Sequence, residues 1–128
     1  MIKLTFALVR RPEFTREAFQ AYWFAHHAPL VASVKDTLRI RRYVQLHSLP
    51  EDVSADLRQV RGGPEGFDGV AQLWWDSLED MAAIATDPAA AAAAAAAAEA
   101  SRLLLEDERK FIDHSRSPLW WGEEKVVF

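Results

Sequence analysis

The chain has 128 residues, half of them hydrophobic and 27% charged, which indicates one domain over residues 1–128 with a core of its own. A formal net charge of −4, without any basic stripe, argues against nucleic acid as the main partner. The absence of cysteine excludes disulfides and thiolate chemistry. The N-terminus does not fit a signal peptide and no apolar run fits a membrane span, so we expect a cytoplasmic protein with no membrane partner.

The N-terminal part of the chain predicts a strand followed by a helix. Residues 2–9 alternate two sets of side chains with the period of two that is typical of a β-strand. Thr15 is a good N-cap residue for a helix over 14–31. Side chains at helical spacing then form one stripe: Phe19, Tyr22, Trp23, His26 and Leu30. Pro29 has no N–H group, so we expect a kink or restart there and a second helical piece to about residue 38.

Two adjacent histidines lie just before this expected break. His26 falls on the aromatic stripe, whereas His27 lies about 80° round from Phe19, at the edge of the stripe. Imidazole is the side chain that gives or takes a proton near neutral pH. A bend beside the two rings would leave space for a cavity, so this segment is where we expect the chemistry, if the protein has any.

The middle of the chain predicts two strands joined by a long loop. Residues 39–47 form a strand with one polar face, made by Arg41, Tyr43, Gln45 and His47. Residues 48–66 hold several prolines and glycines, so we expect a loop there with at most one helical turn from Ser54. Residues 67–75 form the next strand, and its Asp68, Val70, Gln72 and Trp74 share a face.

The C-terminal part predicts a second helical region and a last strand. Ser77 caps a helix, which Asp87-Pro88 restart, with Asp87 as N-cap. The tract Ala89 to Ala98 has the highest helix propensity, and the helix continues toward residue 113. After a turn at 115–118, residues 119–128 predict a strand with an apolar end.

The predicted order is β-α-β-β-α-β, which is the α+β, ferredoxin-like arrangement of a four-stranded antiparallel sheet with two helices on one face. The other face still carries apolar and aromatic side chains, too many to leave in water. A second copy related by two-fold symmetry is the usual cover. We therefore expect a homodimer whose two sheets face each other.

Several segments resemble the EthD-domain proteins, in the order in which that family has them. They are Phe19-x-x-Tyr22-Trp23, His27-Ala28-Pro29-Leu30-Val31, Tyr43-Val44-Gln45, Asp68-Gly69-Val70 with Trp74, and Leu104-x-x-Asp107-Glu108-x-x-Phe111-Ile112-Asp113. The resemblance spans nearly the whole chain. It departs in the alanine tract, where the family has mixed sequence.

The resemblance implies a dimeric α/β barrel that needs no cofactor. It also implies a link to the degradation of ethers and aromatic compounds, or to the tailoring of aromatic polyketides by dehydration or decarboxylation. The family's helix histidine corresponds to His27. Related barrels with lactone-isomerising activity place their working histidine one position earlier, at His26. The stripe favours His26 and the family motif favours His27, and we rank His27 first.

The candidate catalytic residues are His27, with Tyr43 or His47 assisting it, and His26 as the alternative. A structural role competes with each: His27 would cap carbonyls freed by Pro29, and His26 would be a packed core ring. The candidate substrate-binding residues are Tyr22, Trp23, Gln45 and Trp74, although an aromatic stripe more often belongs to the core. The acidic residues Asp107, Glu108 and Asp113 are interpreted as caps or salt-bridge partners. No motif for a metal site or a nucleophile elbow is present.

The leading hypothesis is a cofactor-free enzyme that acts on a small apolar, aromatic or polyketide-like molecule. The reaction would be a proton transfer, such as dehydration, decarboxylation or isomerisation, in a cavity enclosed by the two facing sheets. Two alternatives stay open: an oxidoreductase or oxygenase-associated protein of ether or aromatic degradation, and a non-catalytic accessory or binding protein.

Overall fold

The computed structural model describes residues 1–86 and 88–128 and shows a four-stranded antiparallel sheet. Its strands are β1 (Ile2–Leu8), β2 (Arg42–His47), β3 (Gly69–Trp75) and β4 (Leu119–Gly122), in the spatial order β2-β3-β1-β4. Strands β1 and β3 pair along their whole lengths, from Ile2 opposite Trp75 to Leu8 opposite Gly69. The centre of the sheet is therefore built by strands that lie far apart in the sequence.

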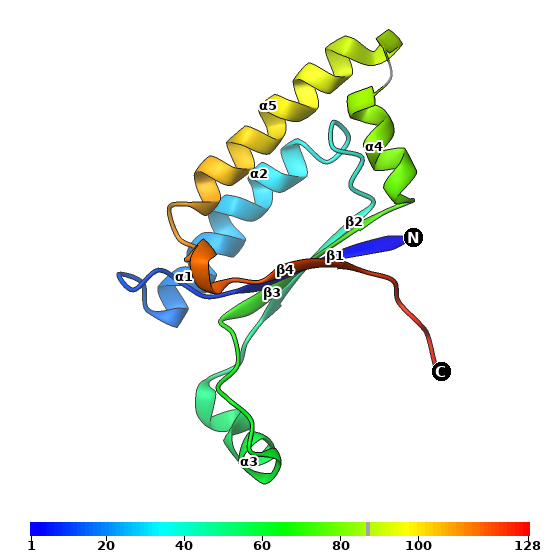
Figure 1. Cartoon of the computed structure of the whole chain (residues 1–128). Coiled ribbons are helices and arrows are strands. Elements are labelled where there is room, and N and C mark those ends of the chain that lie inside the picture. The colour runs from blue at the N-terminus through cyan, green and yellow to red at the C-terminus, as the bar shows by residue number, and fades with distance from the viewer. Residues whose placement is uncertain (87) are drawn as a thin grey trace.

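The helices of the two crossovers form a layer over one face of the sheet, whereas α3 (Glu51–Arg61) lies apart from this layer, as Figure 1 shows. The first crossover holds α1 (Arg16–Tyr22), the π-helical turn η1 (Trp23–His27) and α2 (Ala28–Ser33). The second holds α4 (Leu78–Thr86), the 3-10 turn η2 (Pro88–Ala90) and α5 (Ala91–Glu108), and the 3-10 turn η3 (His114–Arg116) precedes β4. Taken alone, none of the helices in the described part of the chain is long and apolar enough to cross a membrane.

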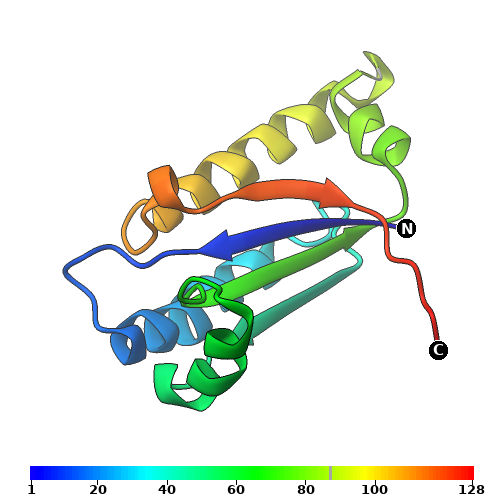
Figure 2. The same ribbon diagram turned by 60° about the horizontal axis from the view of Figure 1, so that its bottom comes forward.

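This arrangement confirms the predicted α+β, ferredoxin-like fold. Thr15 caps α1 as expected, because its hydroxyl accepts a hydrogen bond from the Ala18 N–H at 3.1 Å. In Figure 2 the helical layer lies behind the sheet, and the front of the sheet is left open beside α3 (Glu51–Arg61). The two faces of the sheet thus have different surroundings within one chain.

The prediction of a loop over residues 48–66 is wrong, because this segment contains the 11-residue helix α3. Acidic residues lie in its first turn and basic residues in its last, which suits the helix dipole, and Gly62 ends the helix in a left-handed conformation (φ 64°). The flanking prolines and glycines conceal these signals in the sequence. No residue of α3 is buried, and its apolar stripe faces solvent: Val53, Leu57 and Val60.

Two predicted strand boundaries also change. The last strand ends at Gly122 and does not continue to residue 128, because Gly122 already pairs with Lys3 and little of β1 remains beyond that pair. The last three side chains of the chain are almost fully exposed. The second strand begins at Arg42, since Arg39 adopts a left-handed conformation (φ 59°). The expected N-cap at Asp87 lies outside the described residues.

The core lies where the first crossover and the end of α5 meet β1 and β3. Its main cluster contains Leu8, Phe19, Trp23, Ala71, Phe111 and Ile112. Gly69 lets Trp23 approach the sheet, because a Cβ atom at position 69 would lie 2.5 Å from the Trp23 ring and 2.8 Å from the Leu46 backbone oxygen. The absence of a side chain at residue 69 therefore sets how closely the turn Trp23–His27 packs on the sheet.

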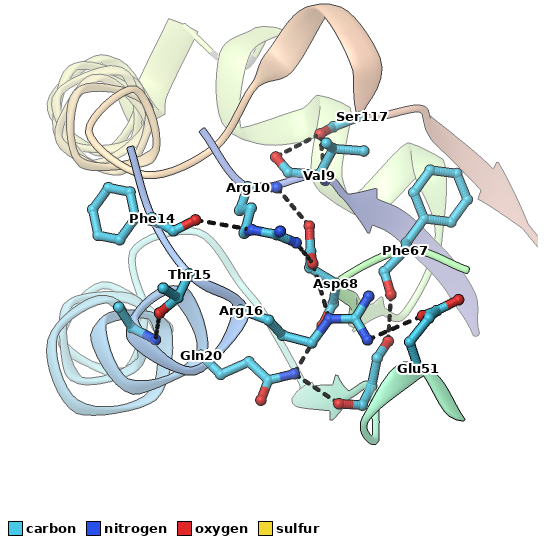
Figure 3. A network of polar contacts seen from close by, with 12 residues as sticks. Val9, Arg10, Phe14, Thr15, Arg16, Gln20, Glu51, Phe67, Asp68 and Ser117 are labelled. Atoms are coloured by element: carbon cyan, nitrogen blue, oxygen red, sulfur yellow. Dashed lines mark hydrogen bonds and ion pairs between the residues drawn. The ribbon is translucent and has the colours of Figure 1, made fainter. Parts of the chain in front are cut away.

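A buried carboxylate fastens the start of α1 to the sheet (Figure 3). Asp68 accepts hydrogen bonds from Arg10 Nη1 at 2.5 Å, from the Arg10 backbone N–H at 2.8 Å and from Arg16 Nε at 3.0 Å. Gln20 donates to the backbone oxygens of Asp68 and Ser48. Burial alone would raise the pKa of Asp68, but the hydrogen bonds from Arg10 and Arg16 outweigh burial and hold this pKa below its usual value.

We expect Asp68→Asn to lower the free energy of unfolding by about 1–3 kcal/mol at neutral pH, because two guanidinium groups lose their charged partner. The folded-state pKa of Asp68 is depressed, so the contribution is present above the unfolded pKa of about 3.9 and is lost as the pH falls toward the folded value. Urea denaturation from pH 7 to pH 3 measures this, with Asp36→Asn on the exposed surface as control. Equal stability of the Asp68 variant and the wild type at pH 7 would contradict the role given to this network.

Candidate functional site

A cavity of about 490 Å³ lies between the helical layer and the sheet of a single chain. The sheet contributes apolar side chains from alternate positions of β1 and β3, such as Phe6 and Leu73, and α5 contributes the methyl groups of Ala94, Ala97 and Ala98. Apart from the two indole N–H groups of Trp23 and Trp75, four lining residues carry polar side-chain atoms: His27, Tyr43, Ser101 and Glu108. An apolar hollow of this size with few polar groups is the usual form of a small-molecule site.

We predicted a cavity between the two facing sheets of a dimer. This prediction is wrong, because the cavity that His27 reaches lies inside one chain. The first crossover lies on the helix-covered side of the sheet, so its imidazole meets a cavity inside one chain. The uncovered face of the sheet lies on the other side of the strands and is out of reach of that ring.

The π-helical turn explains why His27, and not His26, faces the cavity. The Ala28 backbone N–H donates to the Trp23 carbonyl oxygen, five residues back, and not to the residue four back. Such a turn winds the backbone by roughly 85° per residue, compared with about 100° in an α-helix, so His27 returns to the stripe of Trp23 while His26 turns away. His27 is accordingly 6% exposed, whereas His26 is exposed on the surface beside Tyr22.

His27 is held by a buried carboxylate at the end of α5. Its Nδ1 lies 2.7 Å from Asp107 Oδ2, and the Tyr22 hydroxyl donates to Asp107 Oδ1 at 2.6 Å. Burial alone would raise the pKa of Asp107, but the hydrogen bonds from Tyr22 and His27 outweigh burial and lower this pKa. Asp107 is therefore ionised at neutral pH and accepts a hydrogen bond from the Nδ1–H group of His27.

This hydrogen bond leaves the second ring nitrogen of His27 available. Nε2 has no hydrogen-bond partner among the described residues, and it is not sealed inside the protein. A neutral imidazole with its proton on Nδ1 carries a lone pair on Nε2, which is the form that accepts a proton from a bound molecule. The site thus contains an oriented base at the wall of an apolar cavity.

Tyr43 supplies a second polar group on the wall formed by the sheet. Its hydroxyl oxygen accepts a hydrogen bond from Gln45 Nε2 at 2.8 Å, and Gln45 Nε2 also lies 3.0 Å from the Trp23 carbonyl oxygen. Burial raises the pKa of Tyr43 to about 12, so the phenol stays neutral near pH 7. Because Gln45 occupies its oxygen, the Tyr43 O–H group keeps its proton for a ligand.

Three predicted site residues lie away from the cavity. His47 stacks on Trp23 with ring centroids 4.7 Å apart and faces a separate hollow beside Phe24, and burial lowers the pKa of His47. Gln45 lines that same hollow and serves the cavity only through Tyr43. Tyr22 does not line the cavity and instead bonds to Asp107.

Trp74, a predicted substrate-binding residue, lies on the opposite face of the sheet and does not line the cavity that His27 reaches. Its ring is flanked by Lys3 Nζ and by the Arg42 guanidinium, each 4.8 Å from the ring centroid, and its indole N–H donates to Glu124. Successive side chains of a strand point to opposite faces, and the next residue, Trp75, is the one that lines the cavity.

Two acidic residues of the candidate site were not predicted from the sequence to belong to it. Asp107 and Glu108 were interpreted only as caps or salt-bridge partners, and Asp107 is such a partner for His27. The contact between Asp107 and His27 depends on the tertiary fold, because α5 must pack against η1 to bring the two residues together. Within the described residues, no group of three or more His, Cys, Asp or Glu side chains is placed to hold a metal ion.

Comparison with known proteins identifies the family of the chain. The family model described as the EthD domain matches residues 11–115, which include η1 and the Asp107–His27 pair. The chain belongs to the EthD family. No relative among curated proteins matches this EthD-family chain.

Solved structures of low sequence identity share the fold of this EthD-family protein. An ethyl tert-butyl ether D (EthD) family protein from Bacillus halodurans is 20% identical, with 98% of this chain and 100% of that chain covered and a TM-score of 0.55. An EthD-like protein from Ralstonia eutropha is 17% identical, with coverage of 99% and 95% and a TM-score of 0.55. A protein from Bacteroides fragilis, described as dimeric, of unknown function and ferredoxin-like in fold, is 12% identical, with coverage of 96% and 95% and a TM-score of 0.53.

We expect Asp107→Asn to change the tautomer of His27, because a carboxamide can donate to Nδ1 where the carboxylate only accepts. The proton would then move to Nε2, and the free energy of unfolding would fall by about 1–3 kcal/mol. Nitrogen-15 NMR shifts of the His27 ring report which nitrogen carries the proton. Asp113→Asn, at the cap of η3, is the matched control and leaves these shifts unchanged. Unaltered His27 shifts in Asp107→Asn would contradict the assigned pairing.

Proposed function

We propose that this EthD-family protein is a cofactor-free enzyme that transfers a proton on a small apolar molecule of aromatic or polyketide type. His27 is the acid/base, and the reaction is a dehydration, decarboxylation or isomerisation. The observation that carries the proposal is the Asp107–His27 pair at the wall of the apolar cavity of about 490 Å³. A base fixed by a carboxylate and facing a water-poor pocket suits proton abstraction from carbon.

The chemistry of the cavity wall favours a flat, apolar ligand. The rings of Trp23 and Trp75 and the side chains of Phe6 and Leu73 line it. Such walls bind aromatic molecules by burying apolar area, while the Tyr43 hydroxyl offers a hydrogen bond to a carbonyl or hydroxyl group. A neutral phenol also avoids repelling an anion that develops on the ligand, which suits enol or enolate formation.

Two other functions make different predictions. An oxygenase-associated role in ether or aromatic degradation predicts oxygen uptake when a substrate turns over. A non-catalytic binding role predicts that a ligand occupies the cavity and that its chemistry is independent of His27. The polar groups that converge on the cavity from separate elements, η1 and β2, favour the enzymatic proposal.

We expect the wild type to accelerate hydrogen exchange at the α-carbon of 1-tetralone, a bicyclic aromatic ketone, in D₂O. His27→Gln should slow this exchange at least about tenfold, since a positioned acid/base contributes roughly 10²–10⁴-fold. Proton NMR follows the loss of the α-proton signal. The control is His26→Gln, which replaces the exposed histidine next to His27 and keeps the wild-type rate. Equal rates for His27→Gln and the wild type would remove His27 from the proposed mechanism.

We further propose that two copies associate through the uncovered face of the sheet. The side chains that alternate with the cavity-lining ones point to this face, and Leu46 is 55% and Trp120 is 50% exposed there. The dimer described for the Bacteroides fragilis protein supports the proposal.

Leu46→Glu combined with Trp120→Glu should convert a dimer into a monomer, because charges buried at a sheet-to-sheet contact lose their hydration. Analytical ultracentrifugation over a range of protein concentrations measures the mass. Leu103→Glu, at an exposed position of α5, leaves the dimer intact. A wild-type protein that sediments as a monomer at every concentration would refute the dimer.

A further inference from the structure

A second carboxyl group, that of Glu108, lines the same cavity as His27. Its side chain is 20% exposed, and its one polar contact among the described residues is a long one, 3.4 Å from Oε1 to His114 Nε2. Asp107, the preceding residue, instead has two short hydrogen bonds and points to Tyr22 and His27. Consecutive residues of α5 thus direct one carboxyl group at the base and the other at the ligand space.

The surroundings of Glu108 favour its protonated form. Burial in the apolar cavity is the largest influence and raises the pKa of Glu108. The titratable groups around it are His27 from η1, Asp107 on its own helix, His114 from η3 and Tyr43 from β2. The histidines act against burial and Asp107 acts with it, and the net result is a carboxylic acid that keeps its proton to higher pH than an ordinary glutamate.

We propose that Glu108 is the acid that works together with His27, giving its proton to a carbonyl oxygen of the ligand while His27 takes a proton from the adjacent carbon. This inference rests on the proposed function of His27. The assignment follows from one geometric fact: a base from η1 and a carboxyl group from α5 line one apolar cavity, so both border the space that a ligand would occupy.

The reaction balances without an oxidant or a cofactor. His27 Nε2 takes the α-proton, the C–H electron pair forms the carbon–carbon double bond of the enol, and the carbonyl oxygen takes the proton of Glu108. In the reverse step the His27 imidazolium returns a proton to carbon and the carbonyl group re-forms. The enol O–H returns its proton to Glu108, which restores both residues and the ketone.

Two probe reactions separate the acid from the base. Exchange of the α-proton of 1-tetralone needs both a base at carbon and an acid at oxygen. Elimination from 5-nitrobenzisoxazole, in which a base removes one C–H proton and the ring opens, needs the base alone. We expect Glu108→Gln to slow the ketone exchange at least about tenfold and to leave the elimination rate unchanged, since an amide cannot transfer a proton. His27→Gln slows both reactions.

The pH profile adds a readout that a structural role of Glu108 would not produce. The acid must be protonated, so the ketone exchange rate of the wild type falls as pH rises through the raised pKa of Glu108. This limb disappears in Glu108→Gln. Glu106→Gln, on the exposed side of α5, is the matched control and keeps both rates and the limb. Glu108→Met, an apolar replacement suited to the cavity, serves if the Gln variant does not fold.

The outcomes distinguish the two proposals. If His27→Gln slows both reactions and Glu108→Gln slows neither, the acid is not Glu108 and the proposed function of His27 stands. If Glu108→Gln slows both reactions equally, its effect is on the site as a whole and the acid role is overturned. If His27→Gln leaves both rates at the wild-type level, the proposed function itself fails.

Discussion

The buried carboxylate of Asp107 is the interaction on which the arrangement of the site depends. A charge at 6% exposure is expensive to bury unless donors surround it, and the Tyr22 hydroxyl and His27 Nδ1 provide them from two successive segments of the first crossover. The bonds that make this burial tolerable also dock α5 against α1 and η1 and fix the orientation of the imidazole. The contacts that pack the two crossovers together therefore also fix the orientation of the His27 ring.

The two carboxyl groups at the end of α5 show how surroundings alone give neighbouring residues different chemistry. Successive helix positions diverge by about 100°, so Asp107 and Glu108 enter different environments although they are adjacent in sequence. Asp107 meets donors, which lower its pKa, and Glu108 meets apolar walls, which raise its pKa. Surroundings that push the pKa values of two neighbouring carboxyl groups apart are the pattern by which enzymes obtain separate roles from one residue type.

The fold was predictable from the sequence because its elements follow simple periods of hydrophobic residues. The site was predictable only in part. His27, Trp23 and Tyr43 were found, but the reason that His27 turns inward is a widened turn with no simple sequence signature. Trp74 and Trp75 are chemically alike, and only the strand register decides which of them reaches the cavity. The role of Asp107 could not be read from the chain, since it arises from tertiary contact between segments 80 residues apart. Helix α3 was missed because the prolines and glycines that flank it indicate a loop and conceal its helix signals.

The alanine tract forms a wall of the cavity that offers no hydrogen-bonding or charged side-chain groups. This part of the wall presents only methyl groups, those of Ala94, Ala97 and Ala98. A ligand would contact it by van der Waals packing and not by hydrogen bonds. Walls of this kind separate molecules that differ by one methylene only weakly, by about 1–3 kcal/mol. Substitution of any of these alanines by a larger residue would reduce the volume of the cavity. The cavity therefore combines a polar end, formed by His27 and Glu108, with an apolar end whose shape single substitutions can change.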